Sequence, residues 1–247
     1  SFALNAAKQA YEITLEIQRQ ITRHTKTGAL DHFPPILAFQ SVVDSTVTAL
    51  ALVNNLFERL PAMSTKQGEG NQAVHELVLF DINRYAEIGP LMSSNPSAWI
   101  NTMLENNHPN YLLTLLSNRN SENTSVLAFS RKSGSSIILR CDTALSWPED
   151  VYSLSHVALP IPPDDPVYGG QEAGPSPGIH LGDLSLRGEK GVLHLPADDL
   201  LRLRYNPFHA YLRNRILGFM DLGLDPEGFC LSLEPIEQGS ASTPLSP

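Results

Sequence analysis

The sequence has few cysteines and lacks a long apolar run. Cys141 and Cys230 are the two cysteines among 247 residues, and no CxxC spacing relates them. Widely separated cysteines argue against a thiolate metal site and against a redox pair, so we expect both to be reduced. No apolar stretch approaches the roughly 18 residues that a membrane-spanning helix requires. We therefore expect neither a disulfide scaffold nor a membrane span.

Positive charge is also scarce. The chain has 17 Lys and Arg against 26 Asp and Glu, which gives a net charge of −9. An acidic chain offers no basic surface to nucleic acid phosphates or to an anionic membrane, so we expect no nucleic acid partner. Charged residues make up 17% of the chain and hydrophobic residues 42%. This balance favours one large domain with a well-covered core.

Several motifs that would identify a cofactor or a nucleophile are missing. The sequence has neither GxGxxG nor GxxxxGK(S/T), so we expect no nucleotide cofactor, and it has no HxxxH or HxH spacing, so we expect no metal. It also lacks GxSxG, the sharp turn that presents the serine of many hydrolases. Asp81 follows an apolar run, as in phosphotransferases of the haloacid dehalogenase type, but Asn83 and Arg84 break that pattern. We expect Asp81 to be structural.

The sequence contains an alternation of helical and strand patterns. An apolar stripe from Ala6 to Ile21, at spacings of three and four residues, predicts an amphipathic helix that ends near Gly28. Short apolar runs at 36–39 and 76–80, with a helical pattern between them, predict a parallel pair of strands. The other expected elements are strands at 111–116, 125–130, 136–139 and 151–154, helices at about 97–106 and 208–219, an irregular loop over 159–177 and a disordered tail over 234–247. The expected fold class is α/β, with a mainly parallel sheet flanked by helices in a single domain over 1–233.

Two residues occupy positions where catalytic groups gather in such folds. Asp44 comes soon after the strand at 36–39, beyond the carboxyl end where a side chain can reach a neighbouring loop, although it could simply cap the next helix. His156 follows the expected strand at 151–154, at the mouth of the Pro-rich loop. An imidazole there can act as a general base if a carboxylate fixes its tautomer, and Asp44 could supply that carboxylate. The simpler interpretation of His156 is a loop histidine without a role.

Three segments resemble the α/β-hydrolase superfamily, and within it the lysophospholipase-like and carboxylesterase-like serine hydrolases. The run 35–47 (PILAFQSVVDSTV) resembles the strand and turn that present the family's acid, which places Asp44 on that position. The run 76–84 (ELVLFDINR) resembles the next core strand. The run 151–169 (VYSLSHVALPIPPDDPVYG) resembles the loop that presents the family's histidine, which places His156 there.

Two departures from the family pattern shape what the resemblance implies. The interval between Asp44 and His156 is longer than is common in the family, so we expect an inserted, strand-containing segment over about 85–150. The elbow serine, the oxyanion-hole strand and the strands that precede the acid are missing, since only one helix and a loop come before the run at 35–47. The resemblance therefore implies the C-terminal part of an α/β-hydrolase fold, with its nucleophile in a missing N-terminal part.

The resemblance implies a serine hydrolase of carboxylic esters, with Asp44 as the acid and His156 as the base of a Ser-His-Asp triad. An acid and a base without a nucleophile cannot carry out acyl transfer, so we expect the chain alone to be inactive. The expected partners are an ester or lipid substrate and the N-terminal half of the same protein or a second copy of the chain, without a cofactor. The alternative is a non-catalytic α/β binding or interaction module. The two hypotheses differ in whether the Asp44 and His156 side chains lie within hydrogen-bond reach.

Overall fold

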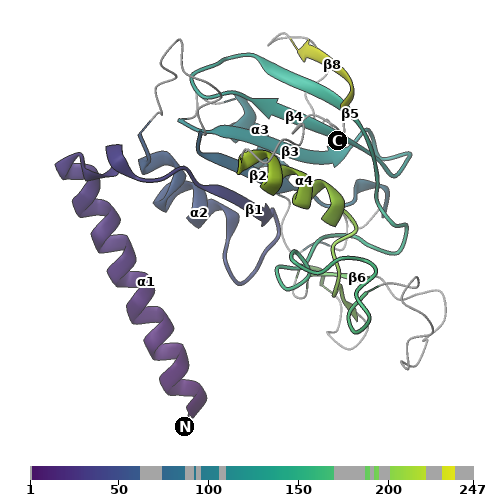
Figure 1. The fold of residues 1–247 in the computed structure, drawn as a ribbon. Coiled ribbons are helices and arrows are strands. Elements are labelled where there is room, and N and C mark those ends of the chain that lie inside the picture. The colour runs from purple at the N-terminus through teal and green to yellow at the C-terminus, as the bar shows by residue number, and fades with distance from the viewer. Residues whose placement is uncertain are drawn as a thin grey trace.

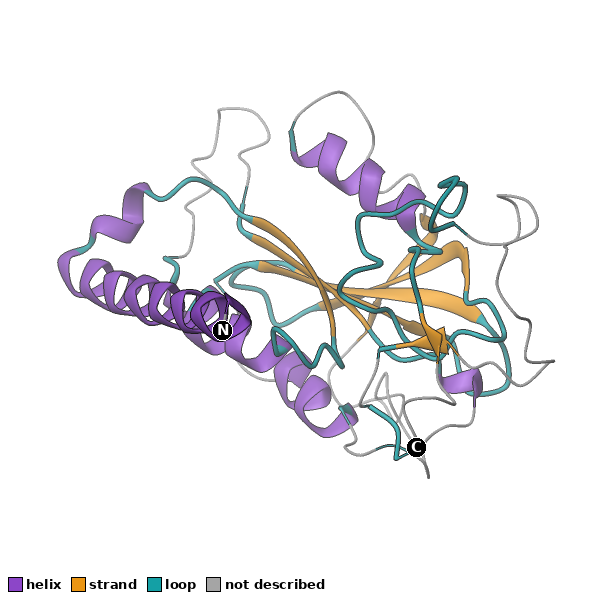
Figure 2. Cartoon of the chain, turned by 90° about the horizontal axis from the view of Figure 1, so that it is seen from below, coloured by secondary structure: helices purple, strands orange, loops and turns teal. Residues whose placement is uncertain are grey.

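The computed structural model describes residues 2–61, 74–86, 92, 96–105, 110–169, 187–189, 192–194, 201–220 and 230–236. Within these residues a six-stranded mixed sheet lies between helices, which is an α/β arrangement (Figure 1, Figure 2). The elements are, in chain order and with η for a 3-10 helix, α1 (Phe2–Thr27), η1 (Ala29–His32), β1 (Leu37–Ser41), α2 (Ala49–Asn55), η2 (Phe57–Arg59), β2 (Glu76–Phe80), η3 (Arg84–Ala86), α3 (Ser97–Glu105), β3 (Leu112–Asn118), β4 (Ser125–Arg131), β5 (Ile138–Ser146), β6 (Arg187–Gly188), β7 (Leu201–Arg202), α4 (His209–Phe219) and β8 (Cys230–Ile236).

The main sheet has the strand order β1-β2-β3-β4-β5-β8. Strands β1, β2 and β3 run parallel, whereas β3, β4, β5 and β8 pair antiparallel. The prediction of a mainly parallel sheet is therefore wrong beyond β3. Short turns join β3 to β4 and β4 to β5, and turns of this length can connect only antiparallel neighbours. Strands β3, β4 and β5 lie within 85–150 and extend the same sheet, so this segment contains strands as predicted, while its being an insertion stays a prediction.

Apolar side chains form a core on each face of the sheet. In β2, Leu77 and Leu79 belong to one core and Val78 and Phe80 to the other, each with an exposed fraction of 0%. Helices α2 and α3 cover the first core, and α4 with the segment 147–154 covers the second. Burial on both faces explains why β2 is a continuous apolar run. This packing holds the carboxyl ends of β1, β2 and β3 at one edge of a rigid sheet.

Helix α1 lies apart from the sheet. Its 26 residues end at Thr27, and the next residue, Gly28, has a left-handed φ of 70°, which agrees with the predicted end of the helix. The main contacts of α1 are with η1 and η2, and its N-terminal part extends away from the sheet (Figure 1). Ile13 and Ile17 of the predicted apolar stripe are 60% and 52% exposed. These two residues of the stripe therefore remain largely open to solvent.

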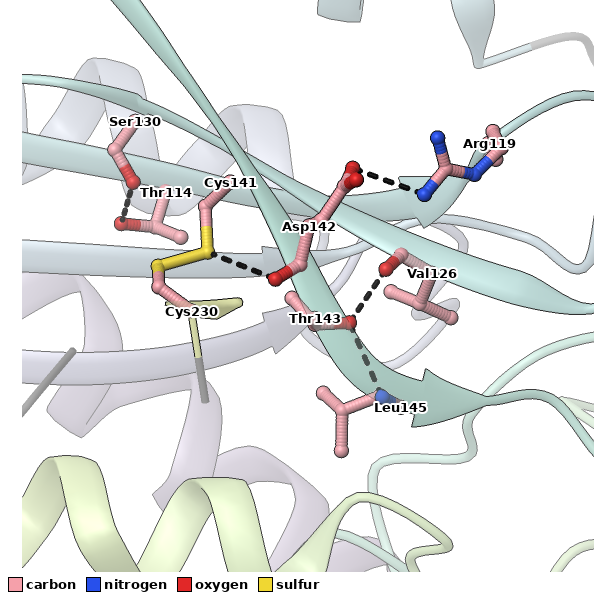
Figure 3. Close-up of a disulfide and its surroundings, with 9 residues drawn as sticks. All are labelled: Thr114, Arg119, Val126, Ser130, Cys141, Asp142, Thr143, Leu145 and Cys230. Atoms are coloured by element: carbon pink, nitrogen blue, oxygen red, sulfur yellow. Dashed lines mark hydrogen bonds and ion pairs between the residues drawn. A yellow bond between two sulfur atoms is a disulfide. The ribbon is translucent and has the colours of Figure 1, made fainter. Parts of the chain in front are cut away.

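The two cysteines form a disulfide between β5 and β8 (Figure 3). The Cα atoms of Cys141 and Cys230 lie 5.4 Å apart. The prediction that they stay reduced and separate is wrong, because separation along the chain does not measure separation in space. The antiparallel pairing of β5 with β8 brings together residues that are 89 positions apart.

Strand β8 also overlaps the predicted tail. Disorder was expected from residue 234, but 234–236 pair with β5, and the residues after 236 lie outside the described ones. A composition rich in Pro, Ser and Glu indicates disorder on average. Composition does not indicate whether the backbone N–H and C=O groups of a neighbouring strand are free to pair with this segment.

The region around the Pro-rich loop agrees with its prediction in part. Residues 151–154 form no strand, apart from one isolated bridge between Val151 and Arg187. The loop is irregular from 159 to 169, as expected, and 170–177 lie outside the described residues. The short apolar run at 151–154 is buried by packing against the sheet instead of by joining it.

Candidate functional site

Asp44 lies in the turn that follows β1. Its Oδ1 accepts hydrogen bonds from the backbone N–H groups of Thr46 (2.7 Å) and Val47 (3.1 Å), and its Oδ2 accepts one from Nε2 of Gln40 (3.0 Å). The N-cap of α2 is Thr48, so the interpretation of Asp44 as the cap of that helix is wrong. Asp44 is instead a buried carboxylate, held in place at the carboxyl end of β1.

His156 is positioned by the segment that precedes it. The backbone N–H of Tyr152 donates to the carbonyl of Arg187 (2.9 Å), and the carbonyl of Tyr152 accepts from the N–H of Asn83 (2.8 Å). A turn over 155–158 follows. Asn83 lies just beyond β2 and Arg187 lies in β6. These bonds therefore hold the backbone segment that precedes His156 against both strands.

The side chains of Asp44, His156 and Glu189 converge. Nδ1 of His156 lies 3.5 Å from Oδ1 of Asp44 and 3.2 Å from Oε2 of Glu189. The carboxylate side chains are 2% and 0% exposed, and the imidazole side chain is 26% exposed. Within the described residues, Nε2 of His156 has no hydrogen-bond partner. The ring therefore directs Nδ1 to two buried acids, and the described residues leave the hydrogen-bonding capacity of Nε2 unused.

Glu189, which directly follows β6, is the member of this cluster that the sequence analysis missed. Its Oε2 accepts from the backbone N–H of His156 (3.2 Å), and its Oε1 accepts from the hydroxyl of Ser45 (3.2 Å). Its own backbone N–H donates to Oγ of Ser153 (2.9 Å), and its carbonyl accepts from the phenol of Tyr152. Glu189 is thus fixed by hydrogen bonds at both its backbone and its side chain.

The close approach of Glu189 depends on the glycine before it. A Cβ atom at Gly188 would lie 2.5 Å from a ring carbon of Tyr152 and 2.7 Å from Oγ of Ser153. Only glycine lets β6 lie this close to that segment. Three residues, Arg-Gly-Glu, are too few for a sequence pattern to identify Glu189 as a site residue. The glycine before it is the one local feature that could have indicated a close contact.

The site holds two buried carboxylates beside one imidazole. Nη2 of Arg202, in β7, lies 3.8 Å from Oε1 of Glu189 and offsets part of the carboxylate charge. Burial, followed by the charge of Glu189, raises the pKa of Tyr152, so its phenol stays protonated and able to donate. Carboxylate oxygens at Nδ1 of His156 favour the tautomer with the proton on Nδ1, because an ionised carboxylate can only accept a hydrogen bond.

The cluster has the composition of a metal site as well as of a general base. One ligand atom each from Asp44, His156 and Glu189 lies within 4.8 Å of the others, close enough for a divalent ion to bridge them. However, Oδ1 of Asp44 already accepts two backbone hydrogen bonds, and Arg202 brings a positive charge to Glu189. The hydrogen bonds therefore favour a base supported by acids, and the absence of a metal stays a prediction.

None of the other histidines that the structure describes forms an ion pair. His75 is 1% exposed, its Nδ1 accepts from the N–H of Ile36 (3.2 Å), and burial lowers its pKa. This is a neutral structural histidine. His108 lies outside the described residues, so the preference for His156 over His75 and His108 as the base stays a prediction.

Asp81 has partners that agree with the expected structural role. Its side chain is 0% exposed and forms an ion pair with Nε of Arg84 (2.8 Å). The hydroxyl of Ser117 donates to the same carboxylate (2.6 Å). These contacts join the carboxyl ends of β2 and β3.

The described residues do not supply a nucleophile to His156. No hydroxyl or thiol among them is hydrogen-bonded to the imidazole, and Ser45 is directed at Glu189.

None of the helices in the described ranges is long and apolar enough to cross a membrane. No family model, curated protein or solved structure matches the chain.

Proposed function

We propose that Asp44 and His156 are the acid and base of a serine ester hydrolase of the α/β-hydrolase type, whose nucleophile comes from outside this chain. The observation that carries the proposal is the imidazole whose Nδ1 lies 3.5 Å from a buried carboxylate and whose Nε2 has no hydrogen-bond partner among the described residues. In such a site Nε2 takes the proton of the attacking serine, and the carboxylate stabilises the resulting imidazolium. The substrate would be a carboxylic ester, a lipid ester included, and no cofactor takes part.

The position of the cluster in the sheet supports this proposal. Strands β1, β2 and β3 are parallel, and Asp44 follows the carboxyl end of β1. The segment before His156 is bonded to Asn83, just beyond the carboxyl end of β2. Open α/β sheets bind ligands at this edge, because the loops after parallel strands meet there. In the proposed fold the antiparallel strands β4, β5 and β8 extend the other end of the hydrolase sheet.

The proposed source of the nucleophile is a segment that pairs with β1. Strand β1 is the edge strand of the described sheet, with β2 as its one strand neighbour. Helix α1 leads into β1 and exposes Ile13 and Ile17, as a crossover helix would if the strand before it were supplied elsewhere. A parallel strand added at β1, from the N-terminal half of the protein, would extend the sheet and cover α1. A second copy of the chain is the competing occupant of this edge.

A non-catalytic interaction module has less support. It assigns Asp44 to a helix cap and His156 to a solitary loop position. Thr48 caps α2 instead, and the ring of His156 faces two acids. Two buried carboxylates cost free energy in a module that makes no use of their charge.

The test is hydrolysis of p-nitrophenyl butyrate by the complete gene product and its variants. His156→Ala should lower kcat by about 10³-fold or more, the scale seen when a triad member is removed. His32→Ala, an exposed histidine in η1, is the matched control and should keep wild-type activity. The isolated 247-residue chain should hydrolyse no ester. A folded His156→Ala variant with near-normal turnover would refute the proposal.

A further inference from the structure

We infer that Glu189 is a second acid of this site, which accepts the hydrogen bond from Nδ1–H of His156 and positions the imidazole. The inference rests on the proposed role of His156 as a base, and it assigns that base a positioning residue. The one-acid site expected from the sequence would then be a site with two acids, in which Asp44 and Glu189 act on the same nitrogen.

The contacts of the two acids with the ring differ. Oε2 of Glu189 lies nearer to Nδ1 than Oδ1 of Asp44 does, at 3.2 Å against 3.5 Å, and only the shorter distance fits an ordinary N–H···O bond. Oδ1 of Asp44 already accepts from two backbone N–H groups of its own turn. Oε2 of Glu189 instead accepts from the backbone N–H of His156 itself. One oxygen therefore holds both the backbone and the ring of the histidine.

Glu189 is rigid enough to act as a positioning group. Its side chain is 0% exposed, and its second oxygen is held by the hydroxyl of Ser45 and faces Arg202. Bonds from Tyr152 and to Ser153 fix its backbone. A carboxylate that is restrained at both oxygens loses little entropy when it orients a base, which is what a preorganised site requires.

The substitution Glu189→Gln removes the charge of this group and keeps its shape. The backbone N–H of His156 needs an acceptor at the position of Oε2, so it selects the amide oxygen of the glutamine for that position. The amide nitrogen then faces Ser45, whose hydroxyl can accept from it. The ring therefore keeps its tautomer while the negative charge beside it is lost. Glu149→Gln, at an exposed acid, is the matched control.

Kinetics of the complete hydrolase test the inference. With Asp44 retained, E189Q should lower kcat by about 10²-fold and leave KM nearly unchanged, on the scale of general-base effects. The acidic limb of its kcat/KM profile should move to lower pH, because Asp44 is then the one described acid facing Nδ1 of His156 and Arg202 loses its carboxylate partner. A purely structural role would reduce the amount of active enzyme without moving the limb. The E149Q control should match the wild type in both respects.

The outcomes separate this inference from the proposed function. Normal kcat and an unmoved pH limb in E189Q, together with an inactive H156A, would overturn the role of Glu189 alone. An active H156A would overturn the base role and the inference with it. Nitrogen-15 NMR of the 247-residue chain with labelled histidine gives a readout without activity. The Nδ1–H signal of His156 should shift in E189Q and stay unchanged in E149Q. Stoichiometric Zn²⁺ bound at Nδ1 instead of a proton would also overturn the inference.

Discussion

At the scale of single residues, surroundings give two histidines opposite properties. His156 presents Nδ1 to two carboxylates, and its imidazole is partly exposed. His75 is 1% exposed, and its Nδ1 accepts from the N–H of Ile36. A protonated Nδ1 cannot accept a hydrogen bond, so the folded protein needs His75 in its neutral form.

His75 should therefore make stability depend on pH. Burial lowers the pKa of His75 in the folded protein. Below about pH 6.5 the unfolded chain therefore binds a proton at His75 that the folded chain does not bind, and the free energy of unfolding falls as the pH falls. A single proton gives a slope of at most about 1.4 kcal/mol per pH unit. Urea denaturation at pH 7.5, 6.5 and 5.5 should show a flatter dependence for His75→Asn than for the wild type. Equal slopes for the two proteins would contradict this assignment.

The residues of the site differ in how far the sequence could predict them. Asp44 follows the half-buried apolar run at 36–39 and His156 follows the buried run at 151–154, so their type and place in the chain gave a signal. Glu189 follows a strand of two residues, which pairs with another strand equally short. No periodicity exists over two residues, and the contact of Glu189 with His156 depends on Gly188 meeting Tyr152 across the fold. The sequence alone gives no indication that Glu189 contacts His156.

At the scale of elements, β8 is held to the sheet by pairing with β5 and by the Cys141–Cys230 disulfide (Figure 3). Its exposed residues include Leu231 at 74%, so packing alone contributes little to its position. A disulfide that closes a long loop restricts the unfolded chain and raises the free energy of unfolding.

Removal of this disulfide should destabilise the protein. We expect Cys141→Ser/Cys230→Ser to lower the free energy of unfolding by about 2–4 kcal/mol, the usual effect of a native disulfide. Urea denaturation of the oxidised wild type against this variant measures the change. Reduced wild-type protein is the control, and it should resemble the variant. Unchanged denaturation midpoints in both would show that the two cysteines are not bonded in solution.

Elements with a strong pattern were predictable, and elements that depend on distant partners were not. The apolar runs of β1 and β2 and the periodic stripe of α1 gave the correct types and nearly the correct bounds. Strands β6 and β7 were missed because two residues carry no pattern, and β8 was missed because its last residues have the composition of a disordered tail and pair with the distant strand β5. Strand direction beyond β3 was also missed, since an apolar run indicates burial and does not encode orientation.

At the scale of the whole molecule, α1 exposes apolar side chains and β1 is the edge strand of the described sheet. Exposed apolar residues on α1 include Leu4 at 71%, Tyr11 at 64%, Ile13 at 60% and Ile17 at 52%. Exposed apolar side chains and an edge strand each favour association with another chain, because both the apolar area and the free backbone groups gain from being covered.

The chain alone should therefore self-associate or bind its proposed N-terminal partner. Ile13→Gln/Ile17→Gln keeps good helix formers on α1 and removes two exposed isoleucines of its apolar stripe, so it should shift the chain toward the monomer in size-exclusion chromatography with light scattering. Val167→Gln, at a residue that is 71% exposed in the Pro-rich loop, is the matched control. A monodisperse wild-type monomer that melts cooperatively and hydrolyses esters would contradict this account of α1 and β1.

The central claim is that His156 activates a serine, and labelling of the complete gene product with a fluorophosphonate probe tests it most directly. The account predicts one labelled serine, identified by peptide mass spectrometry outside these 247 residues, and loss of that label in His156→Ala but not in His32→Ala. Labelling that persists in a folded His156→Ala protein, or ester hydrolysis by a protein that the probe never labels, would contradict it.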